Sequence, residues 1–197
     1  MSNFQQPARA PRHSYALHKT VAMVGMMGAG KTAVGRALAA RLGVSFLDSD
    51  AEIESAANMP VPEIFSRYGE PFFRDKEAKV ISRLLTGEPC ILSTGGGAFL
   101  APANREGITR QGVSLWLEAD VDLLWSRVRH RTTRPLLRTD NPRKTLEDIF
   151  TDRVPVYALA DLSVKSKPGL SIEDMVDRVI ETLLTRGDVL KKVKNDA

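Results

Sequence analysis

The chain has 197 residues, of which 43% are hydrophobic and 26% charged, with a net charge of +4 and one cysteine, Cys90. This length and balance predict one globular domain with a sizeable core, while the lone thiol excludes an internal disulfide and fits a cytoplasmic location. No apolar run approaches the length of a membrane span, and the mild positive charge leaves nucleic acid or small anions as ligands.

The two ends of the chain are predicted to be tails. Residues 1–19 contain Arg9, Arg12 and Lys19 but no acidic residue, and they lack the apolar stretch of a secretory signal. We expect a flexible N-terminal tail there; a cleaved organelle-targeting peptide is the alternative. Residues 187–197 are predicted to be a basic C-terminal tail, the solvated end of a helix, which leaves 20–186 as the folded domain.

Strands and helices alternate along that domain. Short apolar runs predict strands at 20–25, 44–48, 90–93, 113–118 and 162–165. Helical patterns fall at 31–43, 50–57, 61–68, 74–86, 102–111, 121–129, 142–157 and 171–186. This alternation predicts an α/β domain with a parallel sheet covered on both faces.

The first predicted strand and helix enclose the segment "GMMGAGKT", residues 25–32, which matches the phosphate-binding loop pattern G-x-x-x-x-G-K-T. Gly28 and Gly30 allow the backbone to wrap around phosphates at a helix N-terminus. Lys31 is predicted to reach the β- and γ-phosphates, and the Thr32 hydroxyl to bind Mg²⁺. The loop alone does not separate a kinase from a GTPase switch or a motor ATPase.

The second predicted strand ends in "LDSD", which places Asp48 and Asp50 two residues apart. Their side chains would point to the same side of an extended backbone, at the sheet edge where open α/β folds bind ligands. One carboxylate would hold Mg²⁺ through water and the other would accept a proton from an attacking hydroxyl. The alternative is that Asp50 only caps the next helix.

Arg74 lies in "GEPFFRDKE", beside two phenylalanines and near the start of a predicted helix. The planar guanidinium suits a bidentate grip on a carboxylate. In the alternative, Arg74 is a surface ion-pair partner of Asp75 or Glu77.

Three consecutive glycines, Gly95 to Gly97, follow the third predicted strand in "STGGGA". Because glycine costs conformational entropy, three together indicate close approach of another group to this backbone or unusual dihedral angles. A tight turn from strand to helix would need only one or two of them.

The segment 127–138 contains several arginines and neither a carboxylate nor an aromatic residue. The five are Arg127, Arg129, Arg131, Arg134 and Arg138. This composition indicates a segment that meets anions, either as a lid that closes over ATP or as a nucleic-acid surface. The lid is favoured, because nucleic-acid surfaces often add aromatic residues that stack on bases.

Taken together, these motifs resemble the shikimate kinase family from about residue 20 to residue 184. "GMMGAGKT", "FLDSD", "FFRDKE", "STGGGAF", "RPLL" and "DRVPVYALA" occur in that family's order and approximate spacing. The resemblance implies a three-layer P-loop fold like that of nucleoside monophosphate kinases. Its five-stranded parallel sheet has the order 2-3-1-4-5, with a substrate-binding segment at about 50–80 and a lid at about 129–141.

The resemblance also implies an activity, the transfer of the γ-phosphoryl group of ATP to the 3-hydroxyl of shikimate on the route to chorismate and the aromatic amino acids. Asp50 would bind the substrate hydroxyls and act as the base, while Arg74 and Arg153 would clamp the carboxylate. The glycine triplet would lie against shikimate, with Gly96 giving a backbone contact.

At the nucleotide end, the resemblance implies that Arg127 stacks on adenine and that Arg134 reaches the transferring phosphate with Lys31. Asp48 would contact Mg²⁺ through water beside Thr32. The remaining cofactor-binding residues belong to the loop itself: Gly28, Ala29, Gly30 and Ala33. Many family members have Ser-Thr after the lysine where this chain has Thr32-Ala33, which keeps the metal-binding hydroxyl.

The expected partners are shikimate, ATP and Mg²⁺, with no nucleic acid, no membrane and a monomeric state. Three other functions stay open at this point: another small-molecule P-loop kinase such as a gluconate kinase, a nucleotide-dependent switch, and a nucleic-acid-binding protein. "LDSD", the glycine triplet and Arg153 argue against the gluconate kinase.

Overall fold

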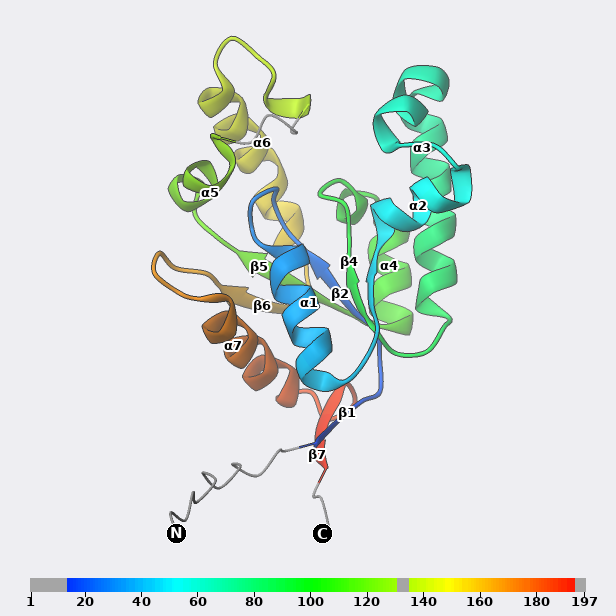
Figure 1. The fold of residues 1–197 in the computed structure, drawn as a ribbon, viewed down its shortest axis with the longest axis vertical. Coiled ribbons are helices and arrows are strands. Elements are labelled where there is room, and N and C mark those ends of the chain that lie inside the picture. The colour runs from blue at the N-terminus through cyan, green and yellow to red at the C-terminus, as the bar shows by residue number, and fades with distance from the viewer. Residues whose placement is uncertain (1–13, 131–134, 194–197) are drawn as a thin grey trace, which may run out of the picture.

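The computed structural model describes residues 14–130 and 135–193. Its centre is a five-stranded parallel sheet in the order β3-β4-β2-β5-β6 (Figure 1). The strands are β2 (Val21–Val24), β3 (Phe46–Asp48), β4 (Ile91–Ser93), β5 (Val113–Glu118) and β6 (Leu162–Lys165). Counted within the sheet, this order is 2-3-1-4-5, so the predicted fold class is confirmed.

Helices cover both faces of the sheet. They are α1 (Lys31–Leu42), α2 (Ser49–Ala57), α3 (Val61–Leu85), α4 (Pro102–Gln111), α5 (Val121–Val128), α6 (Pro142–Tyr157) and α7 (Ile172–Leu184). Helices α1 and α7 pack together on one face, and α3 and α4 pack together on the other (Figure 1). Two short 3₁₀ helices complete the chain, η1 (Ala98–Leu100) and η2 (Pro135–Leu137).

Helix α3 contains the two helices predicted at 61–68 and 74–86, joined end to end. They meet at a kink at Gly69, whose φ of 79° and ψ of 172° are not helical and suit glycine alone. Pro71 follows in the first turn after the kink, where its missing N–H costs little. The second helix therefore begins a few residues earlier than predicted.

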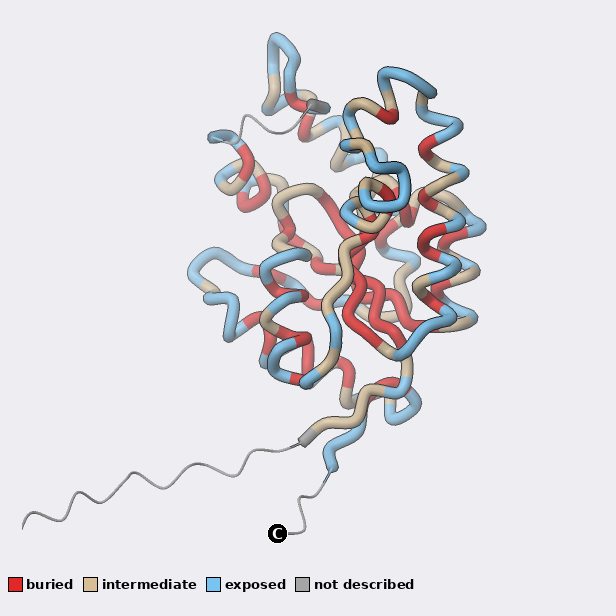
Figure 2. Tube along the Cα trace, turned by 45° about the vertical axis from the view of Figure 1, so that its right-hand side comes forward, coloured by how far each residue is buried: buried red, intermediate tan, exposed pale blue. Residues whose placement is uncertain are grey.

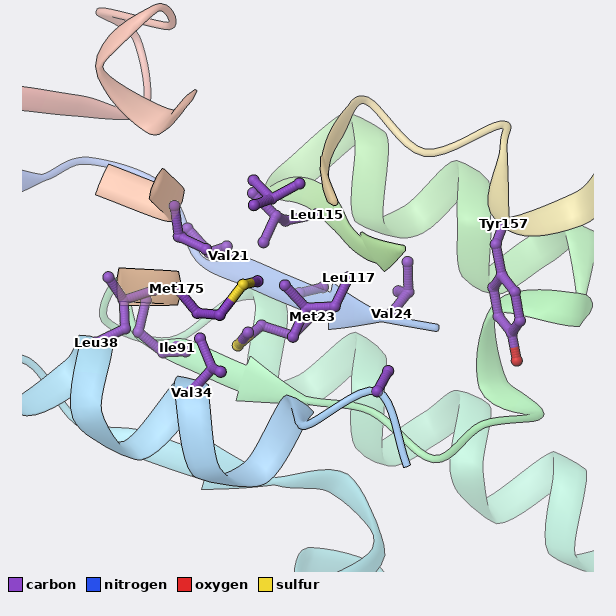
Figure 3. Close-up of a cluster of buried hydrophobic side chains, with 14 of the residues drawn as sticks. Val21, Met23, Val24, Val34, Leu38, Ile91, Leu115, Leu117, Tyr157 and Met175 are labelled. Carbon is purple, nitrogen blue, oxygen red and sulfur yellow. The ribbon is translucent and has the colours of Figure 1, made fainter. Parts of the chain in front are cut away.

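The core lies along the three central strands β2, β4 and β5, most of whose residues are buried (Figure 2). Strand β2 is fully buried at every position, as expected for a central parallel strand without polar alternation. Met23 packs among side chains from its neighbours, including Ile91 of β4 and Leu115 of β5 (Figure 3). This rigid sheet holds the loops at its carboxyl edge in fixed positions.

The predicted tails are wrong in part, because β1 (Ser14–Leu17) and β7 (Leu190–Val193) form a second, antiparallel sheet. Helix α7 ends at Leu184, so the basic C-terminal segment begins as a turn and a strand instead of a helix end. Leu190 is only 1% exposed and belongs to the main core, and Lys19 pairs with Asp188 at 2.8 Å. Residues 14–19 and 187–193, from opposite ends of the chain, are therefore held together and against the core by these contacts.

Residues 1–13 and 194–197 of the predicted tails lie outside the described residues. Within the described part of the chain, no helix has the length and apolar character needed to cross a bilayer.

The β1–β7 pair is predicted to stabilise the domain through Leu190. Leu190→Ala should lower the free energy of unfolding by about 2–5 kcal/mol, because it leaves a cavity in the core. The measurement is urea denaturation, with the exposed neighbour in Lys191→Ala as the matched control, expected to change stability by less than about 0.5 kcal/mol. An unchanged midpoint in Leu190→Ala would show that the strand pair does not support the core.

Candidate active site

A cavity of about 690 Å³ opens at the carboxyl edge of the sheet. The loop after β2, the end of β3 and the loop after β4 all line it, because the carboxyl ends of parallel strands meet at one edge. Arg127 of α5 and the segment before α7 close its far end. The cavity thus brings together most of the segments singled out in the sequence.

The loop after β2 has the geometry of a phosphate cradle. Gly28 and Gly30 have φ angles of 83° and 99°, in the left-handed region that favours glycine. Gly30 begins α1 without a side-chain cap, and no acidic residue lies in the first turn, so the positive end of the helix dipole faces the cavity. The Lys31 ammonium donates to the carbonyls of Gly25 at 2.7 Å and Met26 at 3.1 Å.

The two aspartates at the end of β3 and the start of α2 have different surroundings. Asp48 is the N-cap of α2 and accepts bonds from the backbone N–H groups of Asp50 at 3.1 Å and Ala51 at 3.4 Å. The alternative in which Asp50 caps this helix is therefore wrong, since Asp48 does so. Burial, and then the nearby charge of Asp48, raise the pKa of Asp50, while Lys31 and Arg74 partly oppose the change.

The glycine triplet is where the surrounding side chains come closest to the backbone. A Cβ atom on Gly95 would lie 2.7 Å from the Asp50 carboxylate, and one on Gly97 would lie 2.5 Å from the Arg74 guanidinium. Neither distance is tolerable for a carbon atom. None of the three glycines has a positive φ, so close approach, and not backbone strain, explains Gly95 and Gly97. A Cβ on Gly96 would have its nearest neighbour, the Arg153 guanidinium, at 3.6 Å.

Arg74 lies between two glutamates of its own helix. Its guanidinium donates to Glu77 at 2.8 Å and to Glu70 at 3.1 Å, while Asp75 pairs with Lys79 instead. Glu77 is only 1% exposed, and burial raises its pKa. Its second oxygen has no hydrogen-bond partner among the described residues. Arg74 therefore forms an ion pair with Glu77, as one prediction held. Because Glu77 is buried, this pair holds the guanidinium beside Gly97 and not on the surface.

Helix α6 contributes two side chains that meet at one carbonyl. Arg153 donates to the Gly96 oxygen at 3.4 Å, and the Tyr157 hydroxyl donates to the same oxygen at 2.5 Å. The sequence argument missed Tyr157. Its spacing of four residues from Arg153 places both on one helix face and was the available signal.

The opposite end of the cavity combines a guanidinium with an apolar wall. Arg127 donates to the carbonyls of Gly28 and Ala29, both at 3.3 Å, and to the Ser166 hydroxyl at 3.2 Å. These partners are neutral, and burial lowers the pKa of Arg127. Across the same cavity lie three apolar side chains: Leu170, Ile172 and Met175. Ile172 is 48% exposed, so this wall is open to a ligand.

Two predicted elements remain without a structural test. Arg134 lies outside the described residues, and so does most of the arginine-rich segment around it. Thr32 and Asp48 both line the cavity beside Lys31, although no group of three or more His, Cys, Asp or Glu side chains suited to a metal occurs in 14–130 and 135–193. Magnesium bound by phosphates and water needs few protein ligands.

A profile of the family described as "Shikimate kinase" matches residues 27–184, which include every segment around this cavity. The chain belongs to the shikimate kinase family. Its curated relatives include a shikimate kinase of Ruegeria pomeroyi, 70% identical over 89% of this chain and 90% of the relative. The shikimate kinase of Cereibacter sphaeroides is 65% identical over 89% of this chain and 87% of that protein.

A solved member of the shikimate kinase family supports the same assignment from its fold. The shikimate kinase of Acinetobacter baumannii, solved in complex with shikimate, is 36% identical to this chain with a TM-score of 0.80. The alignment covers 86% of this chain and 94% of that one.

The raised pKa of Asp50 predicts that its charge destabilises the folded protein. Because the folded-state pKa lies above the unfolded one, stability falls as the pH rises through the folded pKa. Asp50→Asn should therefore increase the unfolding free energy at pH 7, with a gain that disappears below the ordinary aspartate pKa of about 3.9. Urea denaturation at several pH values measures this.

The control for that series is Asp75→Asn. Lys79 lowers the pKa of exposed Asp75, so neutralising it should give no gain in stability at pH 7. A loss of stability in Asp50→Asn at neutral pH would contradict the electrostatic picture of the cavity.

Proposed function

We propose that the chain transfers the γ-phosphoryl group of ATP to the 3-hydroxyl of shikimate, giving shikimate 3-phosphate and ADP. One observation carries the proposal: a single cavity is lined by the phosphate-binding loop, by Asp50 and by Gly95 and Gly96. The guanidinium groups of Arg74 and Arg153 lie against the same glycine triplet. Membership of the shikimate kinase family supports this choice of substrates.

The acceptor end suits a small ring that carries a carboxylate and hydroxyl groups. Arg74 and Arg153 approach the glycine triplet from two different helices, so their guanidinium groups suit one carboxylate between them. Glu70, which also binds Arg74, is an exposed partner whose contact contributes little and is easily exchanged for a ligand. Asp50 lies on the third side, where a ring hydroxyl would reach it.

Asp50 is assigned the role of aiming the 3-hydroxyl and accepting its proton. Burial raises its pKa toward the range where a carboxylate is an effective base. The bond from the shikimate oxygen to the γ-phosphorus forms as the bond from that phosphorus to the bridging oxygen of ADP breaks. The proton passes from the hydroxyl to the Asp50 carboxylate.

Lys31 and Arg134 are assigned the role of stabilising the negative charge on the transferring phosphoryl group. Lys31 is bound to two neutral carbonyls, which it exchanges for phosphate oxygens when the nucleotide enters. Thr32 and Asp48 are the residues that would hold Mg²⁺, and when bound the ion neutralises phosphate charge. A closing lid at about 129–141 would exclude water, which otherwise hydrolyses ATP.

The adenine base is assigned to the far end of the cavity. Its ring would stack on the Arg127 guanidinium, whose hydrogen bonds within the described residues go to neutral oxygens. The wall of Leu170, Ile172 and Met175 would cover the other side of the base. A monomeric state, a cytoplasmic location and the absence of nucleic-acid binding stay predictions from the sequence.

The deciding experiment is a coupled assay of ADP release with shikimate, with gluconate or with no acceptor. We expect sustained ADP release only when shikimate is present. Equal turnover with gluconate would favour the alternative small-molecule kinase. Hydrolysis that does not respond to shikimate would favour a nucleotide-dependent switch.

Arg74→Lys should raise the KM for shikimate by roughly tenfold to a hundredfold. An ammonium group cannot reproduce the two-pronged grip, and a charge-assisted hydrogen bond contributes about 1.5–3 kcal/mol. Steady-state kinetics measures the effect, with Arg143→Lys, an exposed arginine paired on the surface, as the control. An unchanged KM in Arg74→Lys would leave this arginine without a part in binding.

Gly97→Ala should weaken both shikimate binding and the fold. The new Cβ would meet the Arg74 guanidinium, which must move away and loosen its ion pair with buried Glu77. The displaced guanidinium should raise the KM for shikimate by about tenfold to a hundredfold and lower the denaturation midpoint.

Gly107→Ala is the matched control for this variant. Its Cβ would have 4.0 Å to the nearest side chain in the middle of α4, so stability should rise by about 0.5–1 kcal/mol with unchanged kinetics. Wild-type binding of shikimate by Gly97→Ala would contradict the close approach of Arg74.

A further inference from the structure

Tyr157 is a buried side chain at the active site that the steps above do not use. It is the last residue of α6, is 0% exposed, and lies beyond the carboxyl end of β2 (Figure 3). Its ring stacks on Trp116 of β5, with 6.4 Å between the ring centroids. A phenylalanine would fill the same space, so packing alone does not account for the hydroxyl.

The hydroxyl points away from the core to the Gly96 carbonyl, to which it donates at 2.5 Å. The other donor to this oxygen, Arg153, is at 3.4 Å, beyond the usual range of N–H···O bonds. The short contact is therefore the one that fixes the carbonyl. Burial also raises the pKa of Tyr157, so the phenol stays a neutral donor over the physiological pH range.

Fixing this carbonyl fixes the next N–H group as well. The Gly96 carbonyl and the Gly97 N–H belong to one planar peptide group, so they turn together. Gly95 is already tied down, since its N–H donates to Ser49 and its carbonyl accepts from Ala98. Within 14–130 and 135–193, no hydrogen bond from the N–H of Gly96 or Gly97 to the protein is formed. Between two glycines, a peptide without such ties turns easily.

We propose that Tyr157 is a positioning residue, whose hydroxyl holds the Gly96–Gly97 peptide so that the triplet presents its backbone N–H groups to the carboxylate or hydroxyls of the acceptor. The inference rests on the proposed function, because it takes the acceptor to be shikimate bound against this triplet. Helix α6 then carries both a ligand for the substrate, Arg153, and the group that orients the backbone beside it.

Tyr157→Phe isolates the hydroxyl, because it keeps the ring on Trp116. We expect the KM for shikimate to rise about three- to tenfold, as for the loss of a neutral hydrogen bond, with an unchanged KM for ATP and only a small decrease in the denaturation midpoint. Tyr15→Phe, which removes a hydroxyl from strand β1, is the control and should leave all three values as in the wild type.

Calorimetric titration of shikimate into the wild type and Tyr157→Phe gives a second measurement that needs no turnover. The dissociation constant should rise by the same factor as the KM. Wild-type KM and dissociation constant in Tyr157→Phe would overturn the inference, and so would a joint rise of both KM values with a lower midpoint, which marks a packing role. If ADP release by the wild type does not depend on shikimate, it is the proposed function that fails, and not only the inference about Tyr157.

Discussion

Close contact between charged side chains and the bare backbone of residues 95–97 is the constraint on which the acceptor end of the cavity depends. Asp50 comes from α2, Arg74 from α3, and Arg153 with Tyr157 from α6, and all reach the same three consecutive residues. Because no Cβ separates them from the peptide groups, three helices are placed by one loop. That loop follows β4, which is buried within the sheet.

Several ionisable side chains in and around the cavity are buried without full compensation of their charge. Burial raises the pKa of Asp50 and Glu77 and lowers that of Arg127, so each of these groups is less stable in its charged form than it would be in water. A nucleotide phosphate would favour the Arg127 cation, and hydroxyl groups of an acceptor that donate to Asp50 would favour its carboxylate. Ligands should accordingly stabilise the fold by more than their contact area suggests.

The parallel sheet and the phosphate-binding loop could be predicted, because they depend on apolar runs and on a local motif, residues 25–32. The strand order and the roles of the cavity residues came from the resemblance to the shikimate kinase family. The β1–β7 pair could not be predicted, since it joins segments at opposite ends of the chain whose composition indicates tails. The two helices predicted at 61–68 and 74–86 were recognised from their patterns, but their direct junction at Gly69 was not. The sequence indicates only that Tyr157 is a core residue. The role of its hydroxyl depends on the packing of α6 beside Gly96, which the sequence does not show. Arg134 and the lid stay predictions.

The pairing of Ser14 with Val193 has a practical consequence for rearranging the chain. The two strands lie beyond the amino edge of the sheet, on the opposite side from the cavity (Figure 1). Partners in an antiparallel pair have Cα atoms about 4.5–5.5 Å apart, so a linker of a few residues can join these positions. The gene can then be opened at an exposed loop elsewhere, giving a circular permutant whose new ends are chosen freely and whose binding cavity is untouched.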